Sequence, residues 1–124
     1  MDIKKHITAL GFVPKNGTNG IYHKIYVDYA IEIDFETQSI NYGSAITAES
    51  KTTQNFSQPE NFVVLECVDR LLTKGYKPQN IVLEKTWPSG HGTSGRLDIC
   101  VNREDGTPYM LIECKTFGKE YNKE

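Results

Sequence analysis

The sequence predicts an α+β (α/β) fold, in which a mixed β-sheet is flanked by helices, and three patterns support that prediction. Residues 59–74 carry apolar side chains around much of a helix, residues 81–87 are mostly apolar, and residues 96–115 alternate in two runs about a turn. Alternation with a period of two is typical of strands, whereas a helix that is apolar over a wide arc must be buried. We therefore expect the helix to pack against a sheet built from the two later segments.

The helix is predicted from Pro59 to Lys74, because proline is tolerated in a first turn and Gly75 suits the position just after a helix end. Its apolar residues are Phe62, Val63, Val64, Leu65, Cys67, Val68, Leu71 and Leu72. Glu66 is the unexpected residue, because it lies within this apolar block. It is either an exposed partner of Arg70 one turn later or an acid directed at a site under the sheet.

The segment from Arg96 to Lys115 is predicted to be a β-hairpin. Asp105 and Gly106 form a pair that is favoured in two-residue type I′ turns. Counting outward from that turn places Asp98 directly opposite Glu113. Lys115, two residues further on, projects from the same face as Glu113.

This register brings two like charges together. Side chains at opposite positions of an antiparallel pair have Cβ atoms only about 5 Å apart, so two carboxylates there repel each other. A divalent cation such as Mg²⁺, which takes carboxylate, carbonyl and water oxygens, would offset the repulsion between Asp98 and Glu113. The alternative is a slipped or bulged register with both acids solvated on an open sheet face.

The N-terminal part is rich in strand signals. Residues 2–10 are predicted to form a short amphipathic helix, and residues 21–43 two or three antiparallel strands. Residues 44–58 are polar and are predicted to be a loop, which could lie over the site. We therefore describe residues 1–58 as a β-rich N-terminal extension of the segment that follows.

Residues 88–95 form a glycine-rich loop between the predicted strand and the hairpin. It is not a phosphate-binding P-loop, because no Gly-Lys-Ser/Thr follows and no helix opens behind it. His91 within this loop could be a ligand or a base, although a lone loop histidine is more often a bystander.

Length and composition predict one domain over residues 1–124, with 59–119 as its core motif region. The net charge of −2 means that any binding of nucleic acid must come from a local patch. The three cysteines fit neither a disulfide framework nor a zinc spacing, so we expect reduced thiols in a cytoplasmic protein. No apolar run reaches membrane-spanning length, and the first residues are not those of a signal peptide.

The order of these elements resembles the PD-(D/E)XK nuclease superfamily. Its motif is an acid on one strand, Asp/Glu-x-Lys on the next, and another acid on a preceding helix. The matching residues here are Asp98, then Glu113-Cys114-Lys115, and Glu66 on the helix. The residue pattern of the hairpin is most similar to that of the N-terminal nuclease domain of type I restriction enzyme R subunits. Leu97, however, occupies the position at which the motif that names the superfamily has a proline.

The resemblance implies Mg²⁺-dependent hydrolysis of DNA phosphodiester bonds. Asp98, Glu113 and the backbone carbonyl of Cys114 would hold the metal, and Lys115 would orient the attacking water. Glu66 would be an outer or second-metal ligand, and Glu84 falls where such domains often place an acid. Further residues implied as contacts to DNA phosphates are Lys85, Arg96 and Lys119.

The resemblance also implies a larger assembly. The sequence ends soon after Lys115, so we expect an N-terminal fragment whose fold is truncated at its C-terminal end and which is inactive alone. ATP is expected only for a motor region that lies further along the full-length protein. That protein would join modification and specificity subunits, and the fragment could form a homo-oligomer.

Two other functions stay open. The first is a non-catalytic module that docks DNA or a subunit, in which Asp98, Glu113 and Lys115 form a structural ion cluster. The second is a small β-rich protein-binding domain with no nuclease ancestry. The second requires that Asp98 and Glu113 do not face each other.

Overall fold

The computed structural model describes residues 2–49, 52–87 and 95–114, with side chains for all of these except residues 86–87 and 95–97. In chain order the elements are α1 Ile3–Ala9, β1 Val13–Pro14, β2 Ile21–Tyr26, β3 Tyr29–Asp34, β4 Ser39–Asn41, β5 Thr47–Ala48, α2 Glu60–Thr73, the 3₁₀ helix η1 Pro78–Asn80, β6 Ile81–Trp87, β7 Gly95–Asn102 and β8 Pro108–Ile112. The predicted α+β class is confirmed.

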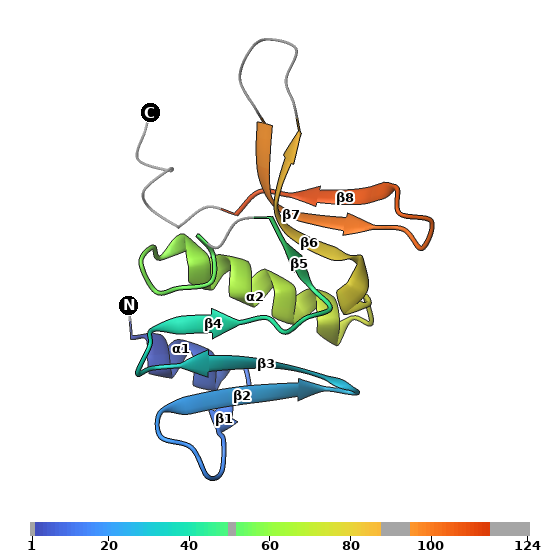
Figure 1. The fold of residues 1–124 in the computed structure, drawn as a ribbon. Coiled ribbons are helices and arrows are strands. Elements are labelled where there is room, and N and C mark those ends of the chain that lie inside the picture. The colour runs from blue at the N-terminus through green and yellow to red at the C-terminus, as the bar shows by residue number, and fades with distance from the viewer. Residues whose placement is uncertain (1, 50–51, 88–94, 115–124) are drawn as a thin grey trace.

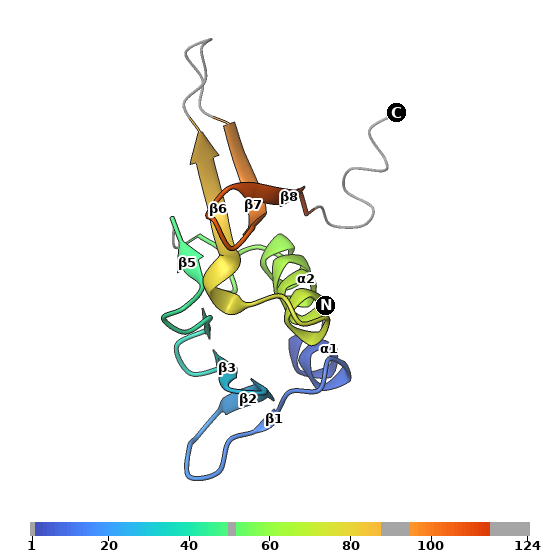
Figure 2. The ribbon, with the colours of Figure 1, turned by 90° about the vertical axis from the view of Figure 1, so that its right-hand side faces the viewer.

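The strands form two sheets that share one core. The first has the order β1-β2-β3-β4 and is antiparallel throughout. The second has the order β5-β6-β7-β8 and is mixed, because β5 runs parallel to β6. Helix α2 lies between the two sheets (Figure 1 and Figure 2), and its buried side chains join those of both sheets in one apolar cluster.

Helix α2 confirms the prediction for residues 59–74. It ends in a Schellman motif, in which Gly75 N–H donates to the carbonyl of Leu72 (3.1 Å) and Tyr76 N–H to that of Leu71 (3.0 Å). Gly75 has φ +101°, which a glycine adopts without strain. The motif therefore fixes where Tyr76 leaves the helix. No helix in the described ranges is long and apolar enough to cross a membrane.

The β7–β8 hairpin has the predicted register but not the predicted turn. Ile99 pairs with Ile112 and Val101 with Met110, as expected. The loop, however, closes by a hydrogen bond from Arg103 N–H to Thr107 O (2.8 Å), and only Gly106 in it has a positive φ. A type I′ turn needs a positive φ at both central residues, so the two-residue turn was wrong.

A second irregularity restores the register. A bulge follows Val101, since Asn102 pairs with Pro108 while Val101 pairs with Met110. Tyr109 is the extra residue of this bulge and has no partner in the ladder. The three-residue loop and the bulge each shift the pairing by one residue, in opposite directions. The two shifts cancel, so the strands pair in the register that a two-residue turn would have given.

The predicted loop over residues 44–58 contains a strand that the sequence did not reveal. Thr47 and Ala48 form β5, which pairs with Val82 and Leu83 of β6. Two residues are too few for a period to be visible, so only the fold shows this strand. Further along the segment, Asn55 forms an isolated bridge with Ser39.

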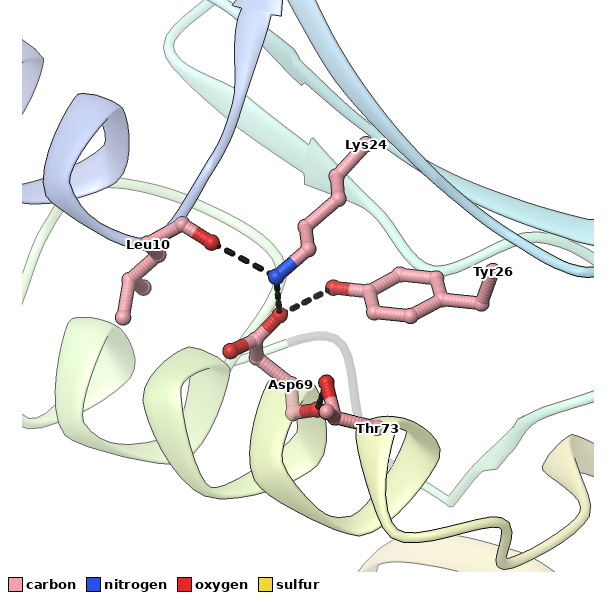
Figure 3. Close-up of polar contacts among 5 residues, drawn as sticks. All are labelled: Leu10, Lys24, Tyr26, Asp69 and Thr73. Atoms are coloured by element: carbon pink, nitrogen blue, oxygen red, sulfur yellow. Dashed lines mark hydrogen bonds and ion pairs between the residues drawn. The ribbon is translucent and has the colours of Figure 1, made fainter.

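A buried ion pair attaches the first sheet to α2 (Figure 3). Asp69 of α2 accepts hydrogen bonds from Lys24 Nζ (2.7 Å) and Tyr26 Oη (2.6 Å), both from β2. Lys24 Nζ also donates to the carbonyl of Leu10 (2.6 Å), which follows α1. Burial, and then the contact with Asp69, raise the pKa of Tyr26. One carboxylate thus fixes how three segments meet.

We predict that Asp69→Ala lowers the free energy of unfolding by about 3 kcal/mol, measured by urea denaturation. The loss arises because the side chain of Asp69 is only 9% exposed, so its removal leaves the Lys24 ammonium without a counter-charge in a largely buried place. The apolar variant K24M/Y26F/D69L should recover most of that stability, because no charge is then buried.

Glu66→Ala provides the matched control on the same helix. Glu66 pairs with Arg70, whose side chain is 71% exposed, so the loss should stay below about 1 kcal/mol. Equal losses in Asp69→Ala and Glu66→Ala would contradict the structural role of the buried pair.

Candidate functional site

Three carboxylates occupy neighbouring positions across β6, β7 and β8. The pairs Leu83–Ile99 and Lys85–Leu97 flank Glu84, which therefore lies opposite Asp98. On the other side of β7, β8 ends at the pair Ile99–Ile112, and continuing that register by one residue sets Asp98 opposite Glu113, which is the arrangement that the sequence predicts. We call Glu84, Asp98 and Glu113 the acidic row.

Asp98 is held by the strand beside it. Its Oδ2 accepts the backbone N–H of Cys114 at 2.7 Å, so the carboxylate reaches across to the chain just after β8. Glu113 is exposed while Cys114 is buried, as expected where successive side chains point to opposite faces. The structure therefore places the Asp98 carboxylate next to the backbone of Cys114, the residue that follows Glu113.

Glu84 departs from ordinary strand geometry. It has φ +57°, a left-handed conformation that is rare for any residue other than glycine. Its side chain is buried, as are those of the three preceding residues of β6. Thr52 Oγ1 donates to Glu84 Oε2 at 2.5 Å. This conformation directs Glu84 toward the segment that precedes α2.

The side chain of Glu84 lines a pocket at the start of α2. The pocket is lined by Thr52, Gln58, Glu60, Asn61 and Glu84. Glu60 is the first residue of α2, and its Oε1 is buried without a hydrogen-bond partner. In both ribbon views the end of β8 lies next to α2 (Figure 1 and Figure 2), and the chain just after it contacts Cys67 near the middle of the helix. Glu84 belongs to the acidic row and also lines the pocket, so the two are adjacent.

Sequence reasoning overlooked Glu60. An acid in a first turn is common because it complements the partial positive charge of a helix N-terminus, so its presence there gave no signal. A second acid, Glu84, reaches the same pocket only because of the left-handed conformation described above. Neither fact can be seen in the order of residues.

Glu66 makes the contacts expected of a partner of Arg70, which is one of the two alternatives that the sequence left open for this residue. Arg70 Nη2 donates to Glu66 Oε2 at 2.7 Å, and His6 Nε2 lies 3.7 Å from Glu66 Oε1. The hydrogen bond and ion pairs that the structure gives Glu66 are with these two residues, and none joins it to the acidic row. Lys85, a predicted phosphate contact, lies 3.4 Å from Glu49.

Several predicted site residues cannot be placed. Lys115, Lys119 and His91 lie outside the described residues, and so does the side chain of Arg96. Within the described ranges, no three His, Cys, Asp or Glu side chains converge closely enough to hold a metal ion together.

Two thiols meet next to the acidic row. A hydrogen bond from Cys114 to the sulfur of Cys67 on α2 lowers the pKa of Cys67 to about 7. The same contact raises the pKa of Cys114, and burial and the charges of Asp98 and Glu113 act in the same direction. The Cys114 side chain therefore lies close to α2 and within electrostatic reach of both carboxylates.

This contact predicts the pH dependence of alkylation. Cys67 should react with iodoacetamide at a rate that is half-maximal near pH 7, since the thiolate is the nucleophile and dominates above its pKa. Cys114→Ala removes the donor, so the half-maximal pH should rise toward that of an ordinary thiol. Peptide mass spectrometry across a pH series measures both.

Cys100→Ala is the control, since Cys100 is buried and takes no part in the contact between Cys67 and Cys114. Its substitution should leave the profile of Cys67 unchanged. A profile that is indifferent to Cys114→Ala would refute the thiol contact.

Comparison with known proteins gives one match. A family model described as the type I restriction enzyme R protein N terminus matches residues 59–124, just over half of the chain. The matched range includes α2 and β6–β8, with every acid of the pocket and of the acidic row. No curated protein matches, and no solved structure does.

Proposed function

The chain belongs to the family of type I restriction enzyme R protein N-termini, and on that basis we propose that it is the endonuclease domain of an R subunit. The reaction would be Mg²⁺-dependent hydrolysis of DNA phosphodiester bonds. The observation that carries this proposal is the position of Asp98, opposite Glu113 and bonded to the backbone N–H of Cys114. In the proposed site the two acids would act together just after the end of β8.

The chemistry of these donors suits Mg²⁺. This cation favours one or two protein carboxylates and keeps several waters, so a pair of acids is sufficient. The bond from Cys114 N–H engages only Oδ2 of Asp98. Asp98, Glu113 and the carbonyl of Cys114 would hold the ion. When bound, Mg²⁺ would activate a water and stabilise the negative charge that develops on the phosphate.

The remaining roles fall to residues around this pair. Lys115 would orient the attacking water and offset phosphate charge, as the motif implies. We assign the helix acid to Glu60 instead of Glu66, because Glu60 shares a pocket with Glu84 and has a buried oxygen without a partner. Glu84, opposite Asp98, would bind the outer waters of the ion.

The assembly follows from the family. DNA phosphates would contact Arg96 and Lys119, and Lys85 only after release from Glu49. ATP would serve a motor region elsewhere in the full-length R subunit. Modification and specificity subunits would be the partners of that protein in the cytoplasm.

The experiment is a titration with Mg²⁺ and Mn²⁺ by calorimetry. We predict that Asp98→Asn and Glu113→Gln each weaken binding at least tenfold, because each removes one of two charged ligands. The amide side chain introduced by Asp98→Asn keeps an oxygen that can accept the N–H of Cys114, so this substitution preserves the local fold. Glu60→Gln should weaken binding by a smaller factor.

Glu66→Gln is the matched control and should bind metal like the unmodified chain, because Glu66 pairs with Arg70. An unmodified chain that binds neither cation at millimolar concentration would instead favour the non-catalytic docking module. Binding that survives Asp98→Asn and Glu113→Gln would place the metal elsewhere and refute the proposed site.

A further inference from the structure

A second groove lies at the opposite end of α2. It is lined by residues that follow the helix and by the β7–β8 hairpin, chiefly Tyr76, Lys77, Asn80, Asn102, Arg103 and Tyr109. Helix α2 has 14 residues, so its two ends are about 20 Å apart. The groove is therefore separate from the acidic row and from the pocket of Glu60 and Glu84.

The fold presents two aromatic rings in this groove. Tyr76 is placed by the Schellman motif of α2, and Tyr109 is the extra residue of the β8 bulge. Their ring centroids are 6.5 Å apart, and the ring planes are inclined by 35°. Tyr109 is 56% exposed, so part of its ring is open to solvent. Both positions result from specific backbone irregularities.

Cations surround the rings. The guanidinium of Arg103 lies 5.4 Å from the centre of the Tyr109 ring and donates to the carbonyl of Pro108 (2.8 Å), which keeps it in place. Lys77 lines the groove, and Lys74 lines the adjoining hollow around Tyr76. A guanidinium has five N–H donors, so Arg103 has donors left for a ligand.

One acid balances part of this charge. Glu104 accepts a hydrogen bond from Asn80 Nδ2 (2.7 Å) and lies 3.6 Å from Lys77 Nζ. Both charged side chains of that pair are more than half exposed, so the ion pair is weak and can exchange partners. Among the residues that line the groove itself, the cations Lys77 and Arg103 outnumber Glu104. Lys74 and Asp28 line the adjoining hollows around Tyr76, and Asp105 lies within electrostatic reach of Arg103. The lining of the groove thus carries one more positive than negative charge.

We propose that this groove binds single-stranded DNA, with a base stacked on Tyr109 and phosphates held by Lys77 and Arg103. Exposed aromatic rings beside cations are what an unpaired strand requires, whereas the bases of a duplex are stacked on each other and cannot reach the rings. The inference rests on the proposed function only for the choice of DNA as the polymer. The groove would hold a strand away from the cleavage site.

The test is fluorescence anisotropy with a labelled oligothymidylate of about 12 nucleotides, in EDTA so that metal binding plays no part. Tyr109→Ala should weaken binding about tenfold, which corresponds to the loss of one stacked base. Lys77→Gln should weaken binding less and reduce its dependence on salt. Asp98→Asn should leave it unchanged, which separates this inference from the metal site.

Two matched controls are available. Leu111→Ala removes a side chain of similar exposure (52%) from the same strand outside the groove, and Lys5→Gln removes an exposed cation from α1. Neither should alter binding. The proposal is overturned if Tyr109→Ala binds like the unmodified chain, if a duplex of the same length binds as tightly, or if only a proline-rich peptide occupies the groove.

Discussion

The burial of α2 between two sheets is the constraint on which the rest of the structure depends. A helix covered on two sides must be apolar over most of its surface, and any polar residue within it must find a partner. Asn61 and Asp69 are the two such residues that are more than nine-tenths buried in the described part of α2. Asn61 donates to the carbonyls of Thr52 and Asn55, and Asp69 binds Lys24 and Tyr26. These bonds select one arrangement of the preceding chain against the helix.

The same constraint positions the functional features. Because α2 is fixed at both ends, its first residue, Glu60, is placed in the pocket with Glu84, and its Schellman motif places Tyr76 in the groove with Tyr109. Cys67, near the middle of the helix, contacts Cys114 beside Asp98. One rigid element thus supports the proposed metal site and the proposed strand-binding groove, so their separation is set by helix length.

Periodic patterns could be predicted from the sequence, whereas contacts that depend on backbone irregularities could not. The helix, β6 and the opposition of Asp98 and Glu113 follow from apolar periods and a turn signal. The predicted register was correct although the predicted turn was wrong, because the shift from a three-residue loop is cancelled by the bulge at Tyr109. The left-handed conformation of Glu84 gave no signal, so the sequence named Glu84 as a candidate acid but not the pocket that it lines. Asp69 was missed because its partners lie more than 40 residues earlier in the chain.

The end of the second sheet is arranged against stability. A left-handed conformation at Glu84 adds strain of about 1 kcal/mol or more, and this acid stands opposite another acid, Asp98, in the register of β6 and β7. A sheet selected for stability alone would carry neutral β-branched residues here and no positive φ. The buried ion pair of Lys24 and Asp69 links β2 to α2, and Asp69 there also accepts a hydrogen bond from Tyr26. The strained conformation of Glu84 is what motivates the proposal of a function for the acidic row, because strained backbone conformations cluster at ligand-binding and catalytic sites.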